Sequence, residues 1–587
     1  MTPHRRTVVA LFLATASAFA AERAAAQTAA PRAPLARRDS TRLLKSAHRA
    51  QGDFERLRRR LLPAQPGLSG RSCRFVIGRY CHTSMRDDGP PPESPKVVAK
   101  RTWLIATLDS LGRALPGDRW ILAQRLRYRM ELGRTDESRA IADECARRAA
   151  AGDLRRWCLA LAGYAAQELG DYAGADSAFA AALAAMPEKE RCGWEDMSLL
   201  LDAETADRFR HLGCAARDTM AAALWRVVQP LYLTGVNDLR TEFLARVTRM
   251  RIEQDARGPM SAYQGADDRE TLLRFGGGLW YTQETRDDGA GPSTVVASHR
   301  RGPAFDFFPE GGVLASLDRL RLGDWAFAAL TPRVGYAPGY AQKFRPLEHQ
   351  LAVFRRGDSA LVVGAFDVSD DANFGGGGLQ AGLFAAPIAH GGVAPPIGGE
   401  IRTERRAAVA TMYAPWQPML VSLEVLDREF AAAARARYAV ALPAGGAQRG
   451  LSDVLLYAPH GTVPATLADA IPHALHQLRS KRSVRLGLFW ESYGARATGE
   501  PVDFALVVVP TGDGRLRRAF DKLRRKEKRS LAMHWREVPA AAGGVAPRAL
   551  ELDVSLLRPG RYRIQLLLDA SSATPVIATR EIELLEH

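Results

Sequence analysis

The sequence predicts a multidomain protein with an all-α, helical-repeat N-terminal half followed by antiparallel β-sandwich domains. Hydrophobic residues recur at helical spacing as far as Gly276, and beyond it they alternate or form short apolar runs between turn residues. The chain of 587 residues is also too long for a single hydrophobic core. These observations together place helical domains first and sheet domains second.

The first 26 residues have the pattern of a secretory signal peptide. Arg5 and Arg6 precede an apolar stretch from Thr7 to Ala20, which is too short to span a bilayer, and small residues follow it. An uncleaved membrane anchor is the alternative interpretation. Residues 27–40 are rich in Ala, Pro and Arg, which predicts a disordered tether. We therefore expect an exported protein that is periplasmic or extracellular, with peripheral association with the envelope as an option.

All six cysteines lie within the first 214 residues. Exported proteins meet an oxidising compartment, so disulfides are expected. Six cysteines allow many pairings, and a metal site is the alternative, but the sequence contains no C-x-x-C or C-x-x-C-H motif. Pairing of sequence neighbours gives Cys73–Cys81, Cys145–Cys158 and Cys192–Cys214.

Residues 41–220 are expected to form a disulfide-linked α-helical domain. A first helix is predicted from Thr41 to Leu62, the prolines of residues 89–95 exclude a helix there, and residues 100–187 are strongly helical. The stretch GDYAGADSAFAAALAAMP resembles a tetratricopeptide repeat, with small residues where two helices touch, an aromatic side chain between them and a closing proline. The matching positions are Gly163, Gly170, Tyr172, Ala175, Phe179, Ala182 and Pro187.

This repeat pattern is incomplete. Leu159 and Ala166 replace the usual Trp and Tyr, and an earlier copy around Gly133 is degenerate. A helical repeat usually needs three or more copies for stability, so the disulfides are expected to compensate.

The second half is divided into a helical linker region at 221–290, a β-rich domain at 291–445 and a C-terminal β-sandwich at 446–587. In the linker, Pro230 and Gly235 interrupt a helical pattern, and a new helix is predicted after Asn237 or Asp238. Short strands with intervening turns then predict sandwiches, and the RPGRYRIQLLL stretch is typical of an immunoglobulin-like domain.

The order of elements from residue 224 onward resembles that of bacterial exported proteins named for a GWxTD motif, whose biochemical role is not established. The residues that follow this pattern in order are Trp225, Pro230, Thr234, Asn237, Glu242, Phe243, Arg246, Asp268, Arg269 and Gly276. The Gly-Trp-x-Thr part is replaced by Gly265-Ala266-Asp267, so no functional residue is transferred from that family.

No catalytic, cofactor-binding or metal-ligating residue is assigned from the sequence, and no cofactor is expected. The chain has no G-x-S-x-G and no H-E-x-x-H motif. His473 and His476 are more simply a solvated or half-buried pair than metal ligands, and Arg356-Gly357-Asp358 is a good turn sequence. Glu491 after Trp490 is interpreted as a strand residue facing water, with a catalytic carboxyl as the alternative.

The charge pattern adds little about the partner. The net charge of +16 favours anionic surfaces, but basic residues are spread along the chain, so no nucleic acid is expected. We expect a non-enzymatic scaffold of the cell envelope that binds a protein partner. The alternatives are an envelope hydrolase acting on glycans or another polymer and a structural subunit of an envelope assembly.

Overall fold

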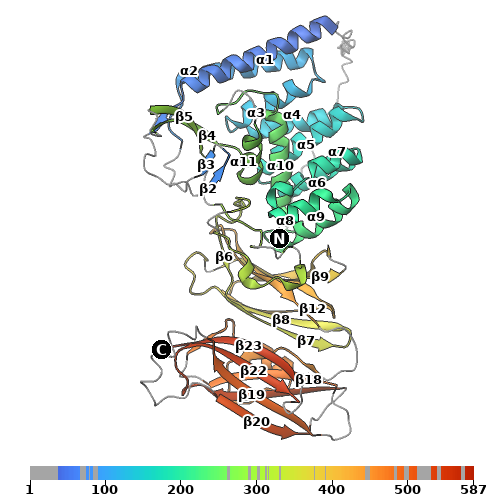
Figure 1. Cartoon of the computed structure of the whole chain (residues 1–587), viewed down its shortest axis with the longest axis vertical. Coiled ribbons are helices and arrows are strands. Elements are labelled where there is room, and N and C mark those ends of the chain that lie inside the picture. Colours follow the sequence, from blue (N-terminus) through green and yellow to red (C-terminus); the bar gives the residue numbers. More distant parts are fainter. Residues whose placement is uncertain are drawn as a thin grey trace, which may run out of the picture.

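The computed structural model describes residues 37–586 except 66–74, 79, 83–89, 261–264, 288–291, 300–303, 311–313, 315, 329–331, 376, 390–391, 443–449, 482–484, 495–500, 512–530, 539–543 and 570–574. The predicted signal peptide, most of the predicted tether and Cys73 lie outside these residues. The described part of the chain forms three units stacked along the long axis of the molecule, with the helices at one end (Figure 1). No described helix has both the length and the hydropathy that crossing a membrane requires.

The N-terminal unit is helical, as predicted. Helices adjacent in sequence from α1 to α6 pack against one another, and α10 lies against α3, α5 and α6. Most of the first helix agrees with the prediction, but it begins at Arg37, so residues 37–40 are helical rather than part of a tether. The helices are α1 (Arg37–Arg60), α2 (Pro95–Ala114), α3 (Arg119–Met130), α4 (Thr135–Arg148), α5 (Asp153–Glu168), α6 (Tyr172–Ala184), α7 (Glu188–Trp194), α8 (Ala203–His211), α9 (Cys214–Val228), α10 (Asp238–Glu253) and α11 (Ala266–Phe275).

Short strands flank these helices. The hairpin of β4 and β5 runs across the predicted domain boundary at residue 290, because its two strands pair along their whole length. Strand β1 pairs with β4, which ties the hairpin to the end of α1 and assigns it to the helical unit. The strands are β1 (Ala64–Gln65), β2 (Phe75–Ile77), β3 (Tyr80–His82), β4 (Trp280–Asp287) and β5 (Pro292–His299).

The middle unit has two sheets packed face to face over one apolar core. One sheet has the order β10-β9-β13-β14-β6 with β11 also on β9, and the other has the order β12-β8-β7. Its strands are β6 (Lys343–Pro346), β7 (His349–Arg356), β8 (Ser359–Asp367), β9 (Leu379–Ala389), β10 (Gly392–Val393), β11 (Ile397–Thr403), β12 (Ala407–Pro415), β13 (Met419–Asp427) and β14 (Ala432–Val440).

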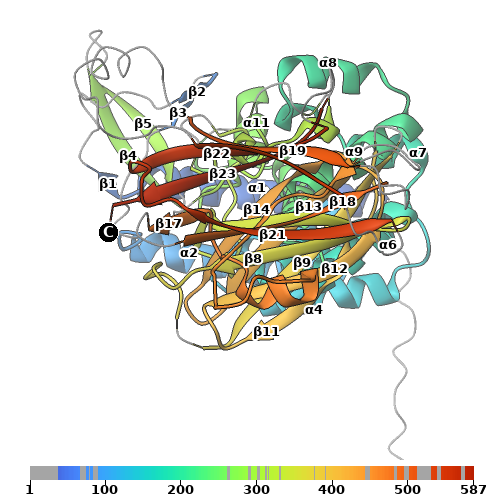
Figure 2. The same ribbon diagram turned by 90° about the horizontal axis from the view of Figure 1, so that it is seen from below.

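The C-terminal unit repeats this two-layer plan. From below, β19, β22 and β23 form one layer, and β18 and β21 form another (Figure 2). A short helix, α12 (Leu467–Ala470), precedes β17. Its strands are β15 (Gly450–Leu451), β16 (Leu455–Tyr457), β17 (Arg479–Lys481), β18 (Arg485–Tyr493), β19 (Val502–Pro510), β20 (Leu531–Glu537), β21 (Val545–Asp553), β22 (Gly560–Leu568) and β23 (Val576–Leu585).

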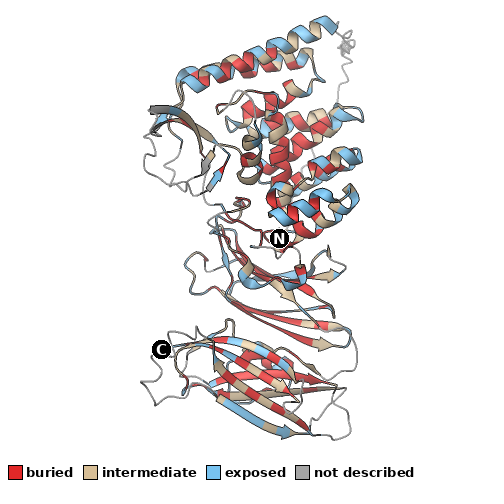
Figure 3. Cartoon of the chain, viewed as in Figure 1, coloured by how far each residue is buried: buried red, intermediate tan, exposed pale blue. Residues whose placement is uncertain are grey.

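The two sheet units share one sheet, β12-β8-β7, which is covered on both faces. Successive residues of a strand point to opposite faces. Val353 and Val362 accordingly belong to the core of the middle unit, while Phe354 and Val363 pack against Phe489 of the C-terminal unit. Strands β7 and β8 are buried over most of their length (Figure 3). We call this contact the sheet–sheet junction.

The helical unit meets the middle unit through a shared apolar cluster that also contains buried charge. Arg435 donates to the carbonyl oxygens of Gln229 and Pro230 at 2.8 and 2.7 Å, just beyond the end of α9. Arg437 donates to the carbonyl oxygen of Val227 at 3.0 Å and to Glu424 Oε1 at 2.8 Å, with no side-chain exposure on either partner of that ion pair. These guanidinium groups satisfy carbonyls that a helix end leaves free. We call this contact the helix–sheet junction.

Candidate binding cavity

A cavity of about 440 Å³ opens in the helical unit and is a candidate binding site. Its wall is built from α1, α2, α3, α5, α10 and β4, which are far apart in sequence. Four guanidinium groups and four carboxyl groups line it. The arginines are Arg58, Arg101, Arg127 and Arg249, and the glutamates are Glu93, Glu131, Glu168 and Glu253.

Aromatic and apolar side chains complete the lining. Tyr164 of α5, Trp280 and Tyr281 of β4, and Met130 and Ile252 of the flanking helices contribute to the wall. The cavity is therefore amphiphilic, with a few polar groups placed among apolar and aromatic surface, as is common in sites that bind small groups.

The ionisation of two of the carboxyls is strongly perturbed, in opposite directions. Burial alone would raise the pKa of Glu131, but the charges of Arg58, Arg127 and Arg101 outweigh it and lower the pKa to about 2. Glu168 is accessible to solvent through the cavity, yet the protein around it displaces much of the water that would solvate its charge. This desolvation, followed by the charge of Glu242, raises the pKa of Glu168 to about 7.

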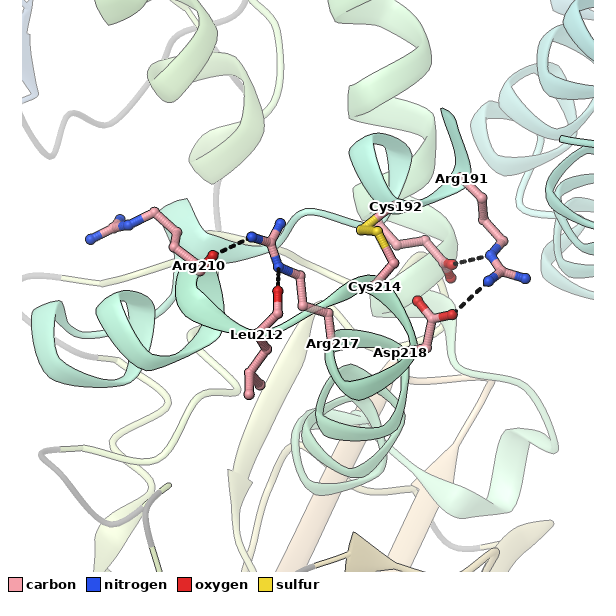
Figure 4. Close-up of a disulfide and its surroundings, with 8 residues drawn as sticks. Arg191, Cys192, Arg210, Leu212, Cys214, Arg217 and Asp218 are labelled. Atoms are coloured by element: carbon pink, nitrogen blue, oxygen red, sulfur yellow. Dashed lines mark hydrogen bonds and ion pairs between the residues drawn. A yellow bond between two sulfur atoms is a disulfide. The ribbon is translucent and has the colours of Figure 1, made fainter. Parts of the chain in front are cut away.

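The sequence-predicted disulfides lie outside the cavity. Cys145–Cys158 joins α4 to α5, and Cys192–Cys214 joins α7 to the start of α9. These are two of the three predicted sequential pairs, and Cys73 of the third lies outside the described residues. Figure 4 shows Cys192–Cys214 beside the ion pair of Arg191 with Asp218, whose atoms are 2.7 Å apart. Arg217 donates to the carbonyl oxygen of Leu212 at 3.0 Å in the same turn.

The predicted repeat residues pack α5 against α6. A Cβ atom on Gly163 would lie 2.9 Å from the ring of Phe179, so only glycine allows this approach. Ala175 and Ala182 are buried on the same face of α6. Gly170 has a φ of +75° in the turn between the helices, which glycine adopts readily.

Two repeat residues lie at the ends of α6. The backbone N–H of Gly339 donates to the hydroxyl of Tyr172 at 2.8 Å, which connects α6 to the middle unit. Pro187 is the N-cap residue of α7. The repeat residues therefore form a helix pair and its connections, and they do not line the cavity.

The residues resembling the GWxTD pattern hold the helix–sheet junction and α10 in place. Asn237 caps α10 and donates to the carbonyl oxygen of Trp225 at 2.6 Å. Arg246 pairs with Glu242 at 2.7 Å and donates to the carbonyl oxygen of Gly335 at 2.7 Å. Trp225 packs against Phe243, with ring centroids 5.4 Å apart. All of these contacts hold helices and loops together, and none of them contributes to the lining of the cavity.

The interpretation of Glu491 as a residue facing water is wrong. Strand β18 lies between β16 and β21, and Glu491 is only 3% exposed. Both of its oxygens accept from Arg356, at 2.6 and 2.8 Å, and Tyr493 donates to it at 3.1 Å. Because Arg356 lies 135 residues earlier in the sequence, the local pattern around Trp490 could not indicate this pairing.

The remaining sequence candidates also have ordinary surroundings. His473 stacks on His460 with ring centroids 3.4 Å apart, and desolvation lowers the pKa of His476. No cluster of three or more potential metal ligands occurs among the described residues. The arginines and glutamates of the cavity were not found from the sequence, because they come from elements far apart in the chain and each looks like part of a solvated face.

Comparison with known proteins gives no family. No protein-family model matches the chain, and no curated protein matches it. Among solved structures, part of the chain matches red sea bream transglutaminase with 11% sequence identity, covering 41% of this chain and 32% of that one. The TM-score of that match is 0.13, which is too low to support an inference about fold or function.

Proposed function

We propose that this protein is an exported, non-enzymatic scaffold that binds a protein partner through the cavity of its helical unit. The observation that carries the proposal is the cavity itself, which collects charged, aromatic and apolar groups from six separate elements. Stacked helices that enclose a cavity commonly bind a segment of another protein.

The class of protein is part of the same proposal. The close approach of Gly163 and Phe179 supports a tetratricopeptide-like helix pair, and the two-layer sheet units support immunoglobulin-like sandwiches. The structural contacts of Asn237 and Arg246 support a relationship to the GWxTD-named proteins. The disulfides support export, because such bonds persist in oxidising compartments.

A site-specific crosslinking experiment tests partner binding. A photo-crosslinking amino acid is introduced at Leu279, which lines the cavity and is 54% exposed, or at Ile577 of β23, which is 50% exposed. In cells of the source organism, we expect a single protein adduct from position 279 and none from position 577. Equal adducts at both positions, or none at position 279, would contradict the proposal.

One observation favours a second candidate function, hydrolysis of a glycan. Glu168 and Glu131 line the same cavity and titrate near pH 7 and pH 2, and pairs of carboxyls with separated pKa values serve as acid and base in glycosidases. However, Glu131 accepts a hydrogen bond from Arg58 at 2.9 Å and is engaged by Arg127, which leaves it a poor base. Release of reducing sugar from envelope glycans, abolished by Glu168→Gln, would establish this second candidate instead.

A further inference from the structure

Charge pairing around the cavity leaves one group over. Each arginine that lines the cavity is already paired with a carboxylate, at nitrogen–oxygen distances between 2.7 and 3.4 Å. Glu131 is shared by Arg58 at 2.9 Å and Arg127 at 3.4 Å, and the buried Glu55 lies 3.5 Å from Arg127. The other pairs are Arg101–Glu93 at 2.7 Å and Arg249–Glu253 at 3.0 Å, so the four arginines have four carboxylates without Glu168. Glu168 is the fourth lining carboxyl, and it makes no ion pair or hydrogen bond among the described residues.

Two phenol groups of the cavity wall also lack a hydrogen-bond partner in the protein. Tyr164 is only 6% exposed, and Tyr281 is partly buried; both line the cavity, and neither hydroxyl has a hydrogen-bond partner among the described residues. A hydroxyl on a cavity wall that has no partner in the protein is open to water or to a group that enters the cavity. Tyr164, Tyr281 and Glu168 all lie close enough to Arg249 to interact with its charge, which places them in one part of the cavity.

We propose that this part of the cavity binds a primary ammonium group, which the partner protein presents as a lysine side chain. The inference rests on the proposed function as a scaffold. An ammonium group has three N–H donors and no acceptor, which suits one carboxylate and two phenol oxygens. The face of the Tyr164 ring also attracts a cation, whereas the Arg58 guanidinium already lies 5.2 Å from the centroid of the Tyr281 ring.

The rest of the cavity suits the lysine stem. The lining includes Met130, Ile252 and Leu61, and such apolar surface packs well against the methylene groups of a lysine. Arg249 and Arg58 are the cations beside Tyr281, and their pairing with Glu253 at 3.0 Å and with Glu131 at 2.9 Å offsets their repulsion. A neutral side chain of the same shape would leave Glu168 and both phenols unpartnered.

Binding of a cation should ionise Glu168 and should therefore depend on pH. The charged groups that face Glu168 are Glu242, Arg246 and Arg249 of α10, which also carries Glu253, and the titratable phenols are Tyr164 and Tyr281. With a pKa of about 7, Glu168 is mostly protonated at pH 6 and mostly ionised at pH 8. The affinity should accordingly rise about tenfold from pH 6 to pH 8.

The test is calorimetric titration of the full chain with three probes at pH 6, 7 and 8. The probes are the peptide acetyl-Gly-Gly-Lys-Gly-Gly-amide, the same peptide with norleucine in place of lysine, and free 1,5-diaminopentane. We expect the lysine peptide to bind at least tenfold more tightly than the norleucine peptide, with an affinity that rises with pH. Glu168→Gln should weaken the lysine peptide at least tenfold and remove the pH dependence, whereas Tyr164→Phe should weaken it severalfold.

The control variant is Glu429→Gln, which removes one exposed carboxylate from the turn between β13 and β14. Its binding should equal that of the unmodified chain, and thermal unfolding of each variant checks that it folds. Equal binding of the lysine and norleucine peptides, or unchanged binding by Glu168→Gln, would overturn the proposal. Binding of the free diamine without the lysine peptide would overturn the assignment to a partner lysine.

The two proposals fail in different ways. An adduct from position 279 without binding of the lysine peptide would leave the scaffold function intact and remove the ammonium site. Binding of the diamine with no adduct from position 279 would retain the ammonium site and remove the scaffold function.

Discussion

Both junctions of the molecule contain an apolar cluster, but among the described residues the helix–sheet junction also contains a fully buried ion pair. At the helix–sheet junction, Arg435 and Arg437 are buried and reach backbone carbonyls, and Glu424 is the counter-ion of Arg437. At the sheet–sheet junction, Phe354 and Phe489 belong to one apolar cluster, and the ion pairs Arg356–Glu491 and Arg479–Glu348 also join the two units.

The chain therefore adds directional contacts to apolar contact at the helix–sheet junction, whereas apolar contact predominates at the sheet–sheet junction. Buried guanidinium groups bind only where carbonyls and a carboxylate are correctly placed, so the helix–sheet junction has a defined orientation. Apolar contact is roughly proportional to buried area and is non-directional. The sheet–sheet junction obtains its orientation instead from the shared sheet β12-β8-β7.

The largest expected effect is the removal of charge at the helix–sheet junction. Glu424→Gln keeps the shape of the side chain but leaves Arg437 buried without its counter-ion, which should cost about 3–5 kcal/mol. Calorimetry should show the loss in the transition of the helical and middle units. The control is Glu348→Gln, whose exposed pair with Arg479 should be worth less than about 1 kcal/mol. Similar melting of the two variants would show that the buried pair is not needed.

The next effect concerns the edge of the sheet–sheet junction. Arg356→Gln removes the guanidinium that both oxygens of Glu491 accept from, and leaves that buried carboxylate with Tyr493 as its side-chain donor. The expected loss is about 1.5–3 kcal/mol, measured by urea unfolding. A loss as large as that of Glu424→Gln would remove the contrast between the two junctions.

The third prediction is a pH dependence that Asp238 contributes at the helix–sheet junction. Burial raises the pKa of Asp238 to about 7, although Tyr340 donates to its carboxyl at 3.1 Å, whereas an unfolded aspartate titrates near about 3.9. This contribution to stability is therefore fully present below about pH 4 and is lost as the pH rises through 7, with a change of about 2 kcal/mol between pH 5 and pH 7.

Comparison with Asp238→Asn isolates this contribution, since Glu168 and Asp306 also have raised pKa values. Thermal unfolding at pH 5 and pH 7 should differ less for the variant than for the unmodified chain. An identical difference would mean that Asp238 does not titrate in this range.

The smallest effect has the opposite sign. The hydroxyl of Tyr457 is buried in the sheet–sheet junction without a hydrogen-bond partner among the described residues. Tyr457→Phe should therefore stabilise the chain by about 1 kcal/mol. The matched change at the other junction, Tyr340→Phe, removes a hydrogen bond to Asp238 and should destabilise it. Destabilisation by both changes would indicate that an ordered water binds Tyr457.

Much of the fold could be predicted because its signals are local. The alternation of MLVSLEVLD and VDFALVVVP predicts strands that coincide with β13 and β19, and Asn237 begins α10 as its capping role predicts. The hairpin of β4 and β5 crosses the predicted boundary at residue 290, and its attachment to the helical unit through β1 is a long-range contact that a local sequence pattern does not show.

The cavity could not be predicted, for the same physical reason. Arg58, Glu131 and Glu168 lie on different helices, and each sits in a sequence that also suits a solvated surface. Only the packing of α1, α3 and α5 brings them to one wall. Glu491 also shows the limit of local patterns. Its aromatic neighbours suggested a catalytic carboxyl as an alternative, whereas the residue that binds it, Arg356, is distant in sequence.

The sheet that serves two cores also limits how the gene can be cut. A fragment ending in the stretch before residue 450 would keep β7 and β8 but lose Phe489 and its neighbours, so Phe354 and Val363 would face water. An exposed flat sheet of this kind is a template for aggregation. The two sandwiches should therefore be expressed, exchanged or duplicated together, because neither face of the shared sheet β12-β8-β7 can lose its partner without exposing apolar side chains.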